Sequence, residues 1–316
     1  GPMSGTGDLR IGIVGASFAG SFHGDIWQQT RRATIVAVAE KDADRREAFA
    51  SKYGVNRSYT EVAELLGDPN VDVVDICLPN FLHAQVAVAA LNAGKDVICE
   101  KPLATTMADA QAVVDAVAES GRRFFYAEDW LFAPALVRAR SVIDEGAIGE
   151  VLYCKGKEVH NGSHSPFAQT IEFCGGGSVI HLGVHPIGLF QALFGPPETV
   201  SGRCSGGLAA NMVHKTMEGE DWGLGVLSFS GGRQGLVEGN YITRGGMDDV
   251  IEFYGTEGVI KVDLTFGSPL TVYSPGGYSY AVEKADFTHG WTRPAIDEYY
   301  SLGYRDELQH FVDCVM

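Results

Sequence analysis

The chain has 316 residues, 45% of them hydrophobic, and a formal net charge of −16. This length is ample for a buried core and suggests two domains. The acidic charge argues against nucleic acid or a membrane as partner, and no apolar run approaches the length that spans a bilayer. The six cysteines show neither C-x-x-C nor zinc-finger spacing, so we expect reduced thiols in a cytoplasmic protein.

The N-terminal segment has a pattern typical of dinucleotide binding. Leu9–Val14 indicates a buried strand, and a glycine turn, Gly15-Ala16-Ser17-Phe18-Ala19-Gly20, joins it to a helical pattern. This order lets main-chain N–H groups at the helix start hold a pyrophosphate. The match is imperfect because Ser17 replaces the middle glycine, although its hydroxyl can bond a phosphate. We assign cofactor contacts to Gly15, Ser17, Phe18, Ala19 and Gly20.

The second strand, Thr34–Ala39, ends at an acidic residue, Glu40. A carboxylate at this place accepts hydrogen bonds from an adenosine ribose diol and repels a 2′-phosphate. Lys41 follows directly and weakens that choice. The pair predicts NAD as the cofactor without excluding NADP.

Strand and helix patterns alternate over about 120 residues, which predicts a doubly wound parallel sheet. Ligands of such sheets bind at the carboxyl ends of the strands. Two further predicted strand ends are polar, at Pro79-Asn80 and at Glu100-Lys101-Pro102. We expect both to lie beside the glycine turn.

A second candidate site follows the triglycine run Gly175–Gly177. The apolar pattern after it predicts a helix on which His181 and His185, four residues apart, leave the same face. Gly188, one turn further on, is expected to leave open space beside them. Two titratable rings above such a gap suggest a reaction site, and two hydrogen-bonded core histidines are the alternative interpretation.

These motifs together resemble the glucose–fructose oxidoreductase / inositol dehydrogenase / MocA (Gfo/Idh/MocA) family of NAD(P)-dependent sugar and polyol dehydrogenases. The carriers are the glycine turn, Pro79-Asn80-Phe81-Leu82-His83, Ala93–Val97, Glu100-Lys101-Pro102-Leu103 and Gly175–His185. The resemblance implies that Lys101 reaches the substrate and the nicotinamide ribose, and that the bond before Pro102 is cis. We assign further cofactor contacts to Pro79, Asn80, His83, Glu100, Lys101, Pro102 and Glu128, besides Glu40 and Lys41.

The second half is β-rich, with short strands between glycine turns, which predicts a mainly antiparallel sheet. We expect an NAD(P)-binding Rossmann domain over 8–127 and an α+β domain over 128–316. The resemblance implies that the second domain binds substrate and has a large open sheet, whose outer face joins subunits as a homodimer or homotetramer. An apolar helical stripe stops at Met316, where family members usually continue, so the C-terminus is either incomplete or shorter than usual.

The site helix departs from the family pattern. Relatives usually have Asp-x-x-x-His followed three residues later by another Asp, whereas this chain has His181, His185 and Gly188. Losing an aspartate removes negative charge, so we expect like-charge crowding to lower the pKa of one imidazole. The proposed catalytic residues are Lys101, His185 and His181, and the proposed substrate contacts are Lys101, His160, His164, His181 and His185.

Three functions are consistent with these patterns. The favoured one is a hydride-transferring dehydrogenase acting on a small carbohydrate or polyol. A less favoured one is metal-assisted chemistry through the His160/His164 and His181/His185 pairs, with Glu128 or Glu158 as carboxylate ligands. The third is a cofactor-binding sensor or scaffold without catalysis.

Overall fold

The computed structural model describes residues 7–163, 165–279 and 288–316, and the chain divides into two compact units. The first unit runs to Ala127 and also includes Arg305–Met316. The second unit is Glu128–Tyr304.

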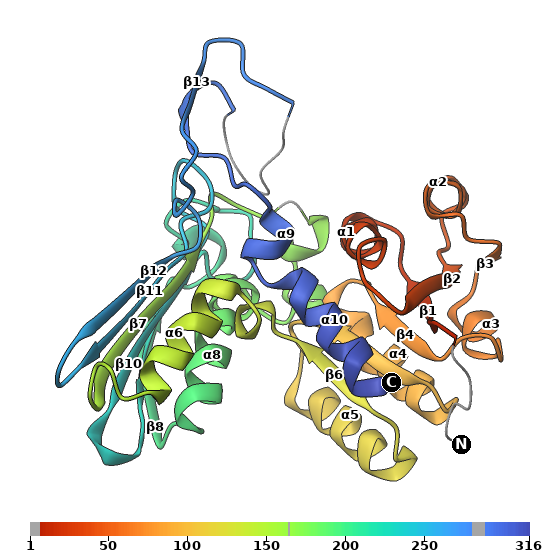
Figure 1. The fold of residues 1–316 in the computed structure, drawn as a ribbon, viewed down its shortest axis with the longest axis horizontal. Helices are drawn as coiled ribbons and strands as arrows, with labels where there is room; N and C mark the ends of the chain where they lie inside the picture. Colours follow the sequence, from red (N-terminus) through yellow and green to blue (C-terminus); the bar gives the residue numbers. More distant parts are fainter. Residues whose placement is uncertain (1–6, 164, 280–287) are drawn as a thin grey trace. The chain divides into compact units, whose positions relative to one another are not determined.

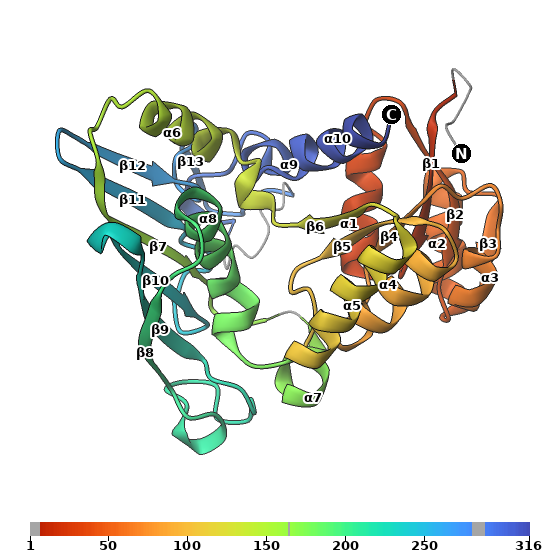
Figure 2. The same ribbon diagram turned by 90° about the horizontal axis from the view of Figure 1, so that it is seen from below.

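The first unit is a six-stranded parallel sheet in the order β3-β2-β1-β4-β5-β6 (Figure 1). Its elements are β1 (Leu9–Val14), α1 (Phe18–Trp27), β2 (Ala33–Ala39), α2 (Ala43–Tyr53), β3 (Arg57–Tyr59), α3 (Val62–Leu66), β4 (Val73–Ile76), η1 (Asn80–Leu82), α4 (His83–Asn92), β5 (Asp96–Glu100), α5 (Met107–Ser120), β6 (Phe124–Ala127) and α10 (Tyr304–Val315). Every residue of β4 is buried, because helices cover both faces of the sheet (Figure 2). The expected doubly wound fold is confirmed, and its order reverses between β1 and β4, where such sheets bind ligands.

The C-terminal helix α10 lies in the first unit, although the sequence analysis placed residues 305–316 in the second domain. The reason is its apolar stripe, of which Leu308 and Val312 are fully buried. Phe311 stacks on Phe125 of β6 with ring centroids 4.8 Å apart. The apolar stripe of α10 is therefore buried against the Rossmann sheet.

The second unit contains a six-stranded sheet in the order β12-β11-β7-β10-β9-β8. Its elements are η2 (Asp129–Leu131), α6 (Pro134–Asp144), β7 (Val151–Val159), η3 (Pro166–Gln169), α7 (Ile171–Cys174), the π-helical η4 (Val179–Gly183), α8 (Val184–Phe194), β8 (Thr199–Cys204), η5 (Leu208–Ala210), β9 (Trp222–Ser228), η6 (Ser230–Gly232), β10 (Gln234–Asn240), β11 (Val250–Gly255), β12 (Val259–Asp263), β13 (Val272–Ser274), β14 (Gly290–Thr292) and α9 (Glu298–Ser301). Only the β7–β10 pairing is parallel among the described strands of this sheet, so the expected mainly antiparallel sheet is confirmed.

The two faces of this sheet differ. Helices α6 and α8 cover one face (Figure 1), where Gly156 of β7 lies against Pro186 and Phe190 of α8. The other face has no helix over it in the described part of the second unit, and a hollow there is lined by residues such as Lys155, Leu236 and Glu252.

One helical stretch among the described residues, Ile171–Phe194, is long and apolar enough to cross a membrane by length and composition alone. No run of that length was predicted from the sequence. Half of the most apolar window is buried inside the protein. Its composition is also what a helix needs when it packs on a sheet.

Candidate active site

The glycine turn of the first unit has the geometry of a pyrophosphate cradle. Gly15 has a φ of +94°, and a Cβ on Gly20 would overlap the carbonyl oxygen of Gly15. The chain therefore passes from β1 into α1 with its backbone exposed to a ligand. Ser17 occupies the N-cap position of α1, but its side chain makes no capping hydrogen bond.

Glu40 is fixed beside this turn at the end of β2. Its carboxylate accepts hydrogen bonds from the main-chain N–H groups of Ala16, at 2.8 Å, and Asp42, at 3.0 Å. Burial alone would raise the pKa of Glu40, but these bonds and the nearby Arg45 lower it. An ionised and oriented carboxylate with lone pairs to spare fits the ribose diol of NAD.

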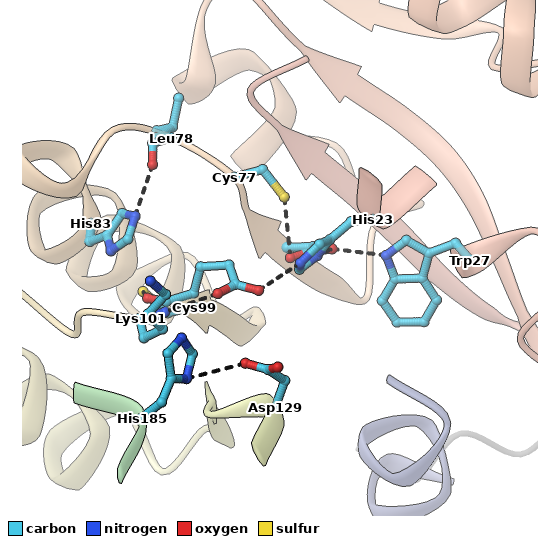
Figure 3. A network of polar contacts seen from close by, with 11 residues as sticks. His23, Trp27, Cys77, Leu78, His83, Cys99, Lys101, Asp129 and His185 are labelled. Atoms are coloured by element: carbon cyan, nitrogen blue, oxygen red, sulfur yellow. Dashed lines mark hydrogen bonds and ion pairs between the residues drawn. The ribbon is translucent and has the colours of Figure 1, made fainter. Parts of the chain in front are cut away.

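The Lys101 turn follows β5, and its Lys101–Pro102 peptide is cis, as the resemblance implies. His83 braces this turn from α4: its Nδ1 lies 2.7 Å from the carbonyl oxygen of Pro102. Its Nε2 lies 2.9 Å from the carbonyl oxygen of Leu78, just before Pro79 (Figure 3). We expected His83 to bind the cofactor, but both of its ring nitrogens face main-chain carbonyls.

A buried network that the sequence analysis missed lies behind the same turn. His23 of α1 places Nδ1 2.7 Å from Asp75 and Nε2 2.8 Å from Glu100 (Figure 3). Asp75 also accepts a hydrogen bond of 2.8 Å from the indole N–H of Trp27. Burial opposes a charge on the ring, but the carboxylate of Asp75 and its neighbours raise the pKa of His23 well above its ordinary value. The sequence feature that could have indicated this network is Asp75, a carboxylate inside the otherwise apolar strand β4.

In the second unit, the triglycine run Gly175–Gly177 precedes the helix that carries His181 and His185. Its backbone contacts the backbone at Glu220. A Cβ on Gly177 would overlap the carbonyl oxygen of Glu220. That oxygen accepts a hydrogen bond from the N–H of Ser178, and the Glu220 carboxylate accepts one from Val179. The helix that follows is also close to the sheet, since a Cβ on Gly239 of β10 would lie only 2.6 Å from the Gly183 nitrogen.

His185 lies in a cage of carboxylates. Its Nδ1 is 2.5 Å from Glu128 and 3.4 Å from Asp129 (Figure 3), and its Nε2 is 3.1 Å from Glu158. The ring stacks on Trp130 with centroids 5.5 Å apart. Burial alone would lower the pKa of His185, but the three surrounding carboxylates raise it to about 10. The lowering expected for one of the two imidazoles does not occur at His185, because three carboxylates surround its ring.

Glu128 fills the open space that was predicted beside Gly188. The side chain of Glu128 is buried, and a Cβ on Gly188 would lie 3.3 Å from the Glu128 Cγ. The carboxylate beside Gly188 thus comes from a segment about 60 residues earlier in the chain. The predicted contact of Glu128 with the cofactor stays a prediction.

His181, at the other substituted position, has a neutral partner. Its Nδ1 lies 2.8 Å from the hydroxyl of Tyr241, just after β10. Burial raises the pKa of Tyr241, so the phenol keeps its proton. His160 bonds to Glu158 at 3.0 Å and so connects to the His185 cage. His164 lies outside the described residues.

Buried His and carboxylate or Cys groups form three clusters among the described residues that could hold a metal ion: His23/Asp75/Cys77, Glu128/Asp129/His185 and Glu158/His160/Asp249. The ligand atoms within each cluster lie within 4.8 Å of one another. The expected pairs do not form such a cluster in the described chain. His181 belongs to none of them, and His160 and His185 lie in different ones.

Comparison with known proteins finds a family match for each of the two units. Residues 9–128 match an oxidoreductase family with an NAD-binding Rossmann fold, and residues 136–261 match the GFO/IDH/MocA C-terminal domain. The chain is 29% identical to levoglucosan dehydrogenase of Pseudarthrobacter phenanthrenivorans, over 91% of this chain and 81% of that one. It is also 29% identical to the NAD-dependent scyllo-inositol 2-dehydrogenase of Bacillus subtilis, over 97% and 86%.

Two solved structures extend the similarity to three dimensions. GenD2 from gentamicin A biosynthesis, in complex with NAD, superposes with a TM-score of 0.90 at 25% identity, over 98% of this chain and 87% of that one. A levoglucosan dehydrogenase with NADH and levoglucosan superposes with a TM-score of 0.80 at 25% identity, over 97% and 90%.

Proposed function

Because the chain belongs to the GFO/IDH/MocA oxidoreductase family, we propose that it is an NAD-dependent dehydrogenase that transfers hydride between nicotinamide and a hydroxyl-bearing carbon of a sugar, polyol or sugar derivative. The observation that supports this proposal is the buried His185, which lies between the carboxylates of Glu128 and Glu158. The names of the relatives, which include levoglucosan and scyllo-inositol dehydrogenases, support the substrate class.

The first unit has residues that fit NAD. The Gly15–Gly20 turn would hold the pyrophosphate, and the Glu40 carboxylate would accept hydrogen bonds from the ribose. When bound, NAD supplies the hydride acceptor or donor. The exposed Lys41 adds a positive charge next to Glu40, so we propose a preference for NAD rather than strict exclusion of NADP.

His185 handles the proton in this proposal, with Lys101 and His181 as further catalytic residues. With a pKa near 10, its ring is an imidazolium at neutral pH. That form donates a proton to a carbonyl oxygen, whereas the neutral ring accepts one from a hydroxyl group. We therefore expect reduction to be favoured at neutral pH and oxidation to accelerate as the pH rises toward 10.

A substrate panel tests this function. Sugars, polyols, aldonic acids and anhydrosugars are supplied with NAD and with NADP while absorbance at 340 nm is followed. We expect turnover on at least one compound, faster with NAD. Cofactor binding without an absorbance change on the panel, and none with the matching keto-sugars and NADH, would overturn the proposal in favour of a sensor or scaffold.

Metal-assisted chemistry is the second candidate, favoured by the two clusters around His185 and His160. Nδ1 of His185 is already hydrogen-bonded to Glu128, so a metal ion would have to replace that proton. Metal content of protein purified without a His tag decides the matter. One ion per chain would support this candidate, and a substoichiometric count would remove it.

We also propose that the protein acts in the cytoplasm and forms a homodimer or homotetramer through the open face of the second sheet. The six free cysteines support a reducing compartment. The uncovered face around Leu236 supports the interface, so light scattering is expected to show an oligomer that Leu236→Arg converts to monomers.

A further inference from the structure

We propose that His23 is a positioning residue for Lys101 and acts through the carboxylate of Glu100. The inference rests on the proposed function, in which Lys101 takes part in the reaction. It concerns a buried histidine of the first unit that has no role in hydride or proton transfer.

The geometry links three elements of the Rossmann sheet. His23 projects from α1 and is 1% exposed, and Asp75 is fully buried in β4. Glu100 is the last residue of β5 and directly precedes Lys101. Since His23 bonds to Asp75 at 2.7 Å and to Glu100 at 2.8 Å, it joins the middle of the sheet to the Lys101 turn (Figure 3).

The two carboxylates require a charged ring between them. An ionised carboxylate only accepts hydrogen bonds, so each ring nitrogen of His23 must carry a hydrogen to satisfy both partners. The positive ring offsets the cost of burying Asp75 away from water. The indole of Trp27 donates to the same Asp75 oxygen, so this carboxylate has a second partner besides the ring.

Glu100 connects His23 to the Lys101 turn. One of its oxygens bonds to His23, and the other accepts a hydrogen bond of 3.2 Å from the main-chain N–H of Lys101. On the far side of Lys101, the carbonyl of Pro102 is bonded to His83. Both ends of the short segment that carries the Lys101 side chain are thus fixed by buried histidines.

Two conservative variants separate positioning from simple packing. In His23→Gln the side-chain amide reaches the place of Nε2 and keeps the bond to Glu100. In His23→Asn it reaches only the place of Nδ1 and keeps the bond to Asp75. We expect His23→Gln to retain most of kcat and His23→Asn to lose about 10²-fold, since small displacements of a reacting group have effects of this size. NADH affinity and Tm are expected to be similar in both variants.

A second measurement does not depend on activity. Hydrogen exchange of the Lys101 amide, followed by NMR, is expected to accelerate in His23→Asn but not in His23→Gln. Unchanged exchange in His23→Asn, or equal loss of kcat and Tm in the two variants, would overturn the positioning role. Accelerated exchange in a protein whose wild type has no turnover would instead support the positioning role and refute the proposed function.

Discussion

His23 in the first unit and His185 in the second unit share one electrostatic arrangement, a buried imidazole between two carboxylates. His23 lies 2.7 and 2.8 Å from its partners, and His185 lies 2.5 and 3.1 Å from its own. In both cases the negative charges outweigh burial and raise the pKa of the ring. A raised pKa therefore does not by itself distinguish a reacting histidine from a structural one.

The surroundings make the difference. Around His23, the indole N–H of Trp27 also bonds to Asp75, which leaves that carboxylate less able to change partners. Around His185 there is a third carboxylate, Asp129, and Glu158 is shared with His160. The additional carboxylates around His185 give its ring proton several acceptors, so that proton can move. The additional donor at Asp75, the Trp27 indole, holds the His23 proton in place. The comparison predicts that changes at His185 affect the chemistry and that changes around His23 affect geometry.

His185→Ala has the largest expected effect. Loss of general acid–base assistance is expected to lower turnover by roughly 10²–10⁴-fold. The Kd for NADH, measured by fluorescence titration, is expected to stay close to the wild-type value because the cofactor residues lie in the first unit. Unaltered turnover would exclude His185 from proton transfer.

Glu128→Gln tests the source of the proton affinity. Without this neighbouring charge the pKa of His185 falls, so the alkaline limb of the oxidation profile is expected to move to lower pH by roughly 1–3 pH units. The measurement is kcat against pH for both proteins. If the limb does not move, Glu128 does not control the titrating group.

The same variant affects stability in a defined pH range. The pKa of His185 is higher in the folded chain, about 10, than its ordinary value of 6.5. Its contribution to the free energy of unfolding is therefore complete below about pH 6.5 and is lost as the pH rises toward 10. Urea unfolding across that range is expected to show a weaker pH dependence in Glu128→Gln.

Gly188→Asp introduces the aspartate that the family resemblance implies at this position and is expected to have an intermediate effect. A side chain there meets the Cγ of Glu128 at 3.3 Å, so overpacking is expected to cost about 1–3 kcal/mol of stability. Adding Glu128→Ala makes room, and we expect the double variant to recover both stability and activity. If the double variant recovers neither, a carboxylate at position 188 cannot replace the carboxylate of Glu128.

Trp27→Phe has the smallest expected effect. It removes one hydrogen bond to Asp75 and is expected to cost about 1 kcal/mol in urea unfolding. Because His23 and Glu100 keep their own contact, kcat is expected to remain unchanged. A loss of kcat comparable to that of His23→Asn would show that the two imidazoles do not differ as proposed.

Much of the fold could be predicted from the sequence, because local patterns and motifs determine it. Leu9–Val14 forms a strand with the predicted bounds. The short polar strand Arg57–Tyr59 was not predicted, because it lacks an apolar pattern and owes its place to pairing with β2.

The site was harder to predict because its charges come from distant segments. Spacing brought His181 and His185 together on one helix, but nothing local indicates that Glu128 fills the space beside Gly188. The rise in the pKa of His185 was not predicted for the same reason. The π-helical turn Val179–Gly183 also has no signature in its apolar sequence.

The close approach of Gly239 to the Gly183 nitrogen has a consequence for enzyme redesign. A methyl group on this strand residue cannot fit unless the helix above it moves away from the sheet. Such a shift would displace His181 and His185 as one body and leave their chemical identities intact. Substitution of a strand residue would thus move both histidines without introducing a new functional group.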